Sequence, residues 1–90
     1  MITQKDADKG NKKLNDTNFW ENGSYGDIYE EDGFLHIDDV DGDWKHTHAY
    51  LDYLMKEMGY EVVEERTKNE APDVIDDWYL SDHIYKEAEK

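Results

Sequence analysis

The chain has 90 residues, with 24 Asp or Glu against 10 Lys or Arg, and its formal net charge is −14 at pH 7. This charge disfavours binding to nucleic acid or to an anionic membrane surface, and it favours a basic partner. The absence of cysteine excludes disulfide bonds and thiolate metal sites, and no apolar run is long enough for a bilayer span or a signal peptide. These features predict a cytoplasmic protein with one small core built around Tyr, Trp and Phe.

The N-terminal segment, residues 1–13, is predicted to be a flexible arm. It carries four lysines and offers little apolar surface that could pack on the rest of the chain. Thr3 and Asp6 have the spacing of a weakened capping box, which would support only a short turn of helix. We expect residues 14–90 to form a single acidic domain, whose negative charge would attract the arm.

The stretch of about residues 26–38 is predicted to form a β-hairpin. Asp32-Gly33 is a signal for a type I′ turn, and apolar residues alternate on both sides of it. Pairing through this turn places residues 28–31 opposite residues 34–37. One face of the hairpin then carries Ile28, Leu35 and Ile37 toward a core.

The same stretch lies within an unusually acidic run. Nine carboxylates and no Lys or Arg occur between residues 21 and 43: Glu21, Asp27, Glu30, Glu31, Asp32, Asp38, Asp39, Asp41 and Asp43. The predicted register places Asp27 opposite Asp38, and facing like charges destabilise a sheet by up to ~1 kcal/mol. A sequence that keeps such a pair gives up stability, which favours a partner for the acidic ribbon. A solvated hairpin with no partner is the alternative.

A central helix is predicted over about residues 44–58. Asp43 can cap its first turn, and Gly59 fits the position that ends a helix. Apolar side chains recur at steps of three and four residues, which predicts a stripe that packs on the hairpin. The stripe consists of Trp44, His48, Leu51, Leu54, Met55 and Met58.

The C-terminal third is predicted to add a strand over about residues 60–66 and a helix after Pro72. Val62 and Val63 are typical of a strand, whereas Val74, Ile75, Trp78 and Tyr85 fit a helical stripe. The strand-like residues of the run 74–80 leave a strand open as the alternative. The predicted fold class is therefore α+β, with a small antiparallel sheet packed on the central helix and a C-terminal helix.

No metal, cofactor or catalytic site is predicted. The motif Asp39-x-Asp41-x-Asp43 begins like a calcium loop, but Trp44 and Tyr50 occupy the positions that require Gly and Glu. His46 and His48 are two residues apart on a helix and point to different faces, so a zinc site would need histidines from separate elements to meet. The sequence has no cysteine nucleophile, no phosphate-binding glycine loop and no Gly-x-Ser-x-Gly motif, so we expect that the protein is not an enzyme.

The small size, the Tyr and Trp content, the acidic hairpin and the acidic patches at residues 61–65 and 73–82 together resemble the small acidic DNA-mimic proteins. In size and charge the chain is similar in particular to the anti-restriction proteins of T-even phages. This resemblance implies an inhibitor in the host cytoplasm, often dimeric, that occupies the DNA-binding surface of a basic protein such as a restriction endonuclease or a nucleoid protein. The phosphate-mimicking carboxylates would be Asp27, Glu30, Glu31, Asp32, Asp38, Asp39, Asp41, Asp43, Glu61, Glu64, Glu65, Asp73, Asp76 and Asp77.

Two other interpretations fit the same charge. The protein could be an acidic interaction module for a basic partner unrelated to DNA, in which case duplex DNA would not displace that partner. Adaptation to a high-salt cytoplasm also produces acidic proteins. Nine of the ten basic residues are Lys, which argues against the high-salt interpretation because replacing Lys is an easy way to gain negative charge.

Overall fold

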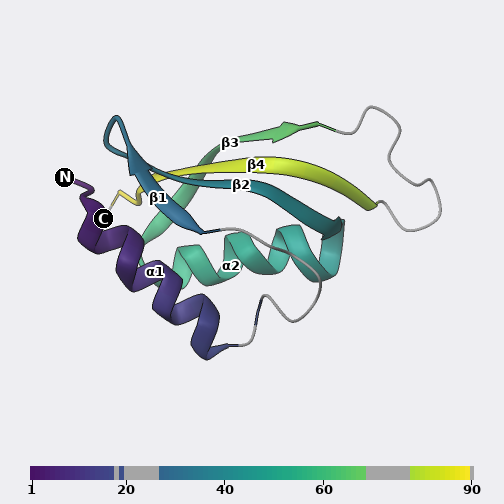
Figure 1. Ribbon diagram of the computed structural model, residues 1–90, viewed down its shortest axis with the longest axis horizontal. Coiled ribbons are helices and arrows are strands. Elements are labelled where there is room, and N and C mark those ends of the chain that lie inside the picture. Colours follow the sequence, from purple (N-terminus) through teal and green to yellow (C-terminus); the bar gives the residue numbers. More distant parts are fainter. Residues whose placement is uncertain (18, 20–26, 69–77, 90) are drawn as a thin grey trace.

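The computed structural model describes residues 1–17, 19, 27–68 and 78–89, and these form an α+β fold, as predicted. A four-stranded antiparallel sheet has the strand order β1-β2-β4-β3, and both helices lie on one side of it (Figure 1). The elements are α1 (Gln4–Asp16), β1 (Ile28–Glu31), β2 (Phe34–Asp43), the π-helical turn η2 (Trp44–His48), α2 (Ala49–Glu57), β3 (Tyr60–Thr67) and β4 (Trp78–Glu87). Among the described residues, no helix lies on the other face of the sheet.

The hairpin of β1 and β2 has the predicted register, with residues 28–31 paired to residues 34–37. Asp32 and Gly33 both have positive φ, 55° and 84°, as a type I′ turn requires. Ile28, Leu35 and Ile37 are almost fully buried beneath the sheet. The alternation of apolar residues and the turn signal were together sufficient to predict this hairpin.

The central helix also forms, although its first turn is wider than expected. The Asp43 carboxylate accepts a hydrogen bond from the His46 amide at 2.8 Å, and the helix ends before Gly59, whose φ is 98°. The first five residues are π-helical, and a π turn shifts the phase of the side chains that follow. Trp44 is consequently 51% exposed, whereas His48 is buried.

The C-terminal segment is a strand, so the predicted helix is wrong. Strand β4 lies in the middle of the sheet and pairs with both β2 and β3. Its inward positions are Tyr79, Ser81, His83 and Tyr85, of which the last three are fully buried. Because the two central inward side chains, Ser81 and His83, are polar, the strand lacks the continuous apolar alternation that identifies a half-buried strand in a sequence.

The N-terminal segment, which was predicted to be a flexible arm, forms an ordered helix. Helix α1 packs against β1 and does not fray. Leu14 is fully buried, and the Asn11 side-chain amide makes two hydrogen bonds, at 2.8 and 3.0 Å, with the backbone of Ile28. The Tyr60 hydroxyl donates to the Asp6 carboxylate at 2.6 Å and, with the amide of Thr3, holds the pKa of Asp6 below its usual value. Helix α1 is therefore connected to both outer strands of the sheet.

Two β-bulges interrupt the sheet, one in β2 between Ile37 and Val40 and one in β3 between Val62 and Glu64. Each inserts one residue, which reverses the inward and outward alternation of the residues that follow. Asp39 lies at the first bulge with a φ of 58°. The described residues contain no helix with the length and apolar content that a lipid bilayer would require.

Candidate functional site

The side of the sheet opposite α1 and α2 carries carboxylates from three strands. Cross-strand pairing places Glu31 of β1, Asp41 of β2 and both Glu61 and Glu64 of β3 on this side, opposite to the buried residues of each strand. Asp38, at the β2 bulge, is exposed there as well and is bonded to Tyr29. We call these five residues, Glu31, Asp38, Asp41, Glu61 and Glu64, the acidic face.

The bulge in β2 determines which acids reach this face. Without an extra residue at positions 38 and 39, strict alternation from Ile37 would turn Asp39, Asp41 and Asp43 toward the core. With it, Val40 and Gly42 are the buried residues instead. The bulge thus keeps these three carboxylates out of the core and places Asp41 on the solvent side.

An aromatic pair supports the hairpin part of the acidic face. The rings of Tyr29 and His36 stack with centroids 5.2 Å apart, and the Tyr29 hydroxyl donates to the Asp38 carboxylate at 2.9 Å. Burial of the hydroxyl, together with the hydrogen bond and the negative charge of Asp38, raises the pKa of Tyr29 to about 12. Asp38 is therefore held in a defined position on the strand.

Three cations partly neutralise the β3 side of the sheet. Arg66 pairs with Glu64 at 2.9 Å, and Lys86 pairs with Glu61 at 3.1 Å. Lys68 contacts both Asp39, at 2.6 Å, and Asp82, at 3.0 Å, and these bonds raise its pKa. By contrast, within the described part of the chain no ion pair involves Asp27, Glu31 or Asp32, so the hairpin end has the larger uncompensated charge.

The remaining residues that were predicted to bind a partner do not belong to the acidic face. Some make contacts within the fold, and the others lie in other parts of the chain. Glu30 accepts a hydrogen bond from the Gly33 amide at 3.0 Å and so supports its own turn, and Asp43 caps the helix. Glu65 turns toward the core. Asp73, Asp76 and Asp77 lie outside the described residues. Asp27 and Asp32 are exposed at the two ends of β1.

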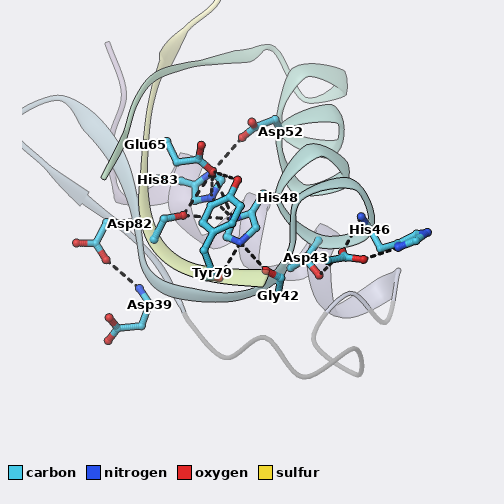
Figure 2. A network of polar contacts seen from close by, with 12 residues as sticks. Asp39, Gly42, Asp43, His46, His48, Asp52, Glu65, Tyr79, Asp82 and His83 are labelled. Carbon is cyan, nitrogen blue, oxygen red and sulfur yellow. Dashed lines mark hydrogen bonds and ion pairs between the residues drawn. The ribbon is translucent and has the colours of Figure 1, made fainter. Parts of the chain in front are cut away.

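A second cluster of polar residues lies between the sheet and the start of the central helix (Figure 2). His48 Nδ1 is 2.9 Å from His83 Nε2, and Glu65 Oε1 is 3.4 and 3.1 Å from these two nitrogens. The Ser81 hydroxyl lies 3.2 Å from His48 Nδ1 and 3.4 Å from Glu65 Oε1. We call His48, Glu65, Ser81 and His83 the histidine cluster.

The far nitrogen of each imidazole in the histidine cluster has its own partners. His48 Nε2 lies 3.2 Å from the Gly42 carbonyl and 3.1 Å from the Tyr79 carbonyl. His83 Nδ1 lies 3.1 Å from an Asp52 carboxylate oxygen and 3.0 Å from the Tyr85 hydroxyl, which itself donates to Asp52 at 2.6 Å. Burial raises the pKa of Tyr85 well above its usual value, so this hydroxyl keeps its proton.

The histidine cluster is almost entirely enclosed. His48 and His83 are 1% and 0% exposed, and the Tyr79 ring stacks on His48 with centroids 3.9 Å apart. Burial lowers the pKa of His48, which favours the neutral imidazole. Only Glu65, whose side chain is 31% exposed, connects the cluster to solvent.

The sequence did not indicate this cluster, because its members come from three separate elements. His48 is on η2, Glu65 on β3, and Ser81 and His83 on β4. The bulge in β3 is essential: from Tyr60, strict alternation would turn Glu64 inward, whereas the extra residue turns Glu65 inward opposite His83. Among the described residues, His48, Glu65 and His83 form the one group of at least three side chains with the geometry to hold a metal ion.

Comparison of the chain with protein-family models, with curated proteins and with solved structures finds no match. The function must therefore be inferred from the chemistry of the acidic face and of the histidine cluster.

Proposed function

We propose that this protein inhibits a basic DNA-binding protein by occupying its DNA-binding surface. The observation that supports this most directly is the acidic face, where the side of the sheet opposite α1 and α2 holds Glu31, Asp38 and Asp41 on adjacent strands. A cationic groove that binds phosphates can bind such carboxylates through charge-assisted hydrogen bonds from Arg and Lys.

The overall charge density is of the right order for a competitor of DNA. A net charge of −14 along a longest dimension of 39 Å gives about 0.36 charges per Å, against about 0.59 per Å for duplex DNA. The density is about three fifths of that of the duplex. Long-range attraction to a basic surface would then raise the rate of association and would be weakened by salt.

The fixed geometry of the hairpin end adds to this attraction. Carboxylates on a disordered tail lose conformational freedom when they bind, whereas those on paired strands are already ordered. The hydrogen bond from Tyr29 to Asp38 fixes one of these carboxylates further. In this role the protein needs no catalytic chemistry and no cofactor, and it would act in the cytoplasm where its target binds DNA.

Restriction endonucleases and nucleoid proteins are the classes of partner that this proposal favours. A basic partner unrelated to DNA is the alternative, and competition with duplex DNA separates the two. If a partner captured by the protein is released by duplex DNA, the shared surface is a DNA-binding surface; if it is not released, the alternative holds.

The proposal is tested by neutralising charge on one side of the molecule at a time. The face variant combines Glu31→Gln, Asp38→Asn and Asp41→Asn, and the control combines Asp8→Asn, Asp16→Asn and Glu57→Gln on the exposed sides of the helices. Both variants lose three negative charges. The assay is inhibition of DNA cleavage by a panel of restriction endonucleases.

The face variant should inhibit about tenfold less well, because three surface contacts of about 0.5 kcal/mol each sum to about 1.5 kcal/mol, close to the 1.4 kcal/mol that corresponds to a tenfold change. The control variant should inhibit as the unmodified protein does. Equal loss in both variants would show that only net charge matters, and would contradict a defined binding face.

A further inference from the structure

The histidine cluster has the donor geometry of a metal site. In a tetrahedral site with bonds of about 2.0–2.1 Å, neighbouring donor atoms lie about 3.3–3.4 Å apart. The donors His48 Nδ1, His83 Nε2 and Glu65 Oε1 are separated by 2.9, 3.1 and 3.4 Å. Ser81 Oγ lies 3.2 Å from His48 Nδ1 and 3.4 Å from Glu65 Oε1, close to where a fourth donor would be.

The hydrogen bonds around the two imidazoles direct lone pairs toward each other. His48 Nε2 faces two carbonyl oxygens, which can only accept, so this nitrogen carries the hydrogen. His83 Nδ1 faces the Asp52 carboxylate and a Tyr85 hydroxyl whose own hydrogen is given to Asp52, so it is also a donor. In neutral rings the nitrogens that face each other at 2.9 Å are then both acceptors, and so is Glu65 beside them.

Three converging acceptors can be satisfied by a proton shared between the two imidazoles or by a bound metal ion. The Ser81 and Tyr79 hydroxyls supply hydrogens to this group, but each has only one, and both lie within hydrogen-bonding distance of Glu65. A divalent ion would satisfy both imidazole lone pairs and the carboxylate together. Its charge would also balance the two carboxylates of the site, Glu65 and Asp52.

The surroundings match the outer shell that metal-binding histidines usually have. Such a histidine donates its other ring hydrogen to a carboxylate or a backbone carbonyl, which orients the ring and makes the binding nitrogen more basic. Asp52 does this for His83, and the carbonyls of Gly42 and Tyr79 do it for His48 (Figure 2). The 31% exposure of the Glu65 side chain leaves a route from solvent.

We propose that His48, His83 and Glu65 bind one divalent transition-metal ion, with Ser81 at or near the fourth position, and that this ion joins η2 to strands β3 and β4. Two imidazoles, a carboxylate and a near-tetrahedral arrangement favour Zn²⁺. The site is independent of the proposed inhibitory function, since the acidic face lies on the opposite side of the sheet.

The test is a titration of the chelator-treated full chain with ZnCl₂. Calorimetry measures the binding, and NMR of the imidazole nitrogens identifies the histidines involved. The buffer contains excess Ca²⁺, which favours oxygen ligands and therefore occupies the weak sites on exposed carboxylates. We expect one Zn²⁺ per chain, shifted resonances of His48 and His83, and a higher unfolding temperature. Asp52→Asn, which removes the orienting carboxylate, should weaken binding about 10- to 100-fold and leave the stoichiometry at one.

The matched variants are His83→Gln and His46→Gln. His46 is an exposed histidine that also contacts a carboxylate, at 2.5 Å from Asp43, so it has similar ligands without the enclosed geometry. His83→Gln should abolish the tight site and His46→Gln should leave it unchanged. If His83→Gln fails to give the native circular dichroism spectrum, Glu65→Gln replaces it, since Glu65 is partly exposed.

Two results would overturn the proposal. One is the absence of any Zn²⁺ binding above that of the His83→Gln or Glu65→Gln variant, which would mean that a shared proton alone holds the two imidazoles. The other is tight binding that is lost in His46→Gln, which would place the metal on the surface.

Discussion

Gly42 lies near the end of β2, where this strand packs against the first turn of the central helix, and it is buried there. A Cβ atom at this position would overlap the buried Thr47 side chain, with Cγ2 only 2.6 Å away, far inside the 3.5–4.0 Å that carbon atoms prefer. Gly42→Ala should therefore destabilise the protein by about 1–3 kcal/mol. Urea denaturation followed by circular dichroism measures this change.

The matched control is Gly10→Ala, in the middle of α1. A Cβ there meets the Ile28 side chain at 2.5 Å, but the contact is with the terminal methyl group, which can rotate away. The better helix propensity of Ala, worth about 0.8–1.0 kcal/mol, should offset the contact, so Gly10→Ala should remain near the unmodified stability. If Gly42→Ala were as stable as Gly10→Ala, β2 and Thr47 could not be packed as described.

His48, Glu65 and His83 show why residue-level chemistry was hard to predict from the sequence. His48 could be placed beside the core stripe of the helix, but its partner comes from β4, which was predicted to be helical. Glu65 was expected at the surface, and only a one-residue bulge turns it inward. A bulge depends on how two strands pair, and a single strand's sequence contains no signal for it.

At the scale of elements, the hairpin and the central helix were predictable because local signals and hydrophobic pattern agree. Asp32-Gly33 specifies the turn, Asp43 the start of the helix and Gly59 its end. Strand β4 was not predictable in this way, because its inward positions Ser81 and His83 are satisfied by hydrogen bonds and not by apolar contacts. Polar residues at core positions remove the alternation on which a strand assignment depends.

Helix α1 provides the sharpest test at this scale, because the sequence suggested a frayed arm. Leu14 is fully buried and belongs to the core cluster with Ile28 and Leu35. Leu14→Ala should cost about 2–5 kcal/mol, as other large-to-small core substitutions do. Lys12→Ala, at an exposed position on the same helix, is the control, and thermal unfolding of both variants gives the comparison. Equal stabilities would mean that α1 does not pack on the sheet.

At the scale of the whole molecule, the apolar core and the acidic face lie on opposite sides of the sheet. Helices α1 and α2 cover one side of the sheet (Figure 1) and bury the apolar residues. The strand pairing places the acidic face on the other side. The radius of gyration of 12.6 Å agrees with the value of about 12 Å expected for a chain of this length. The acidic character of this surface was predictable from the sequence, whereas the cations that neutralise Glu61 and Glu64 were not.

The measurement that tests the central claim most directly is the affinity for a captured DNA-binding partner at several salt concentrations, with and without duplex DNA. If the acidic face occupies a DNA-binding surface, binding should weaken steeply between about 50 and 200 mM salt, as phosphate contacts do, and duplex DNA should compete for the partner. The face variant should show a smaller salt slope than the helix-side control. An affinity that is flat with salt, or a partner that binds DNA and this protein at the same time, would contradict the account.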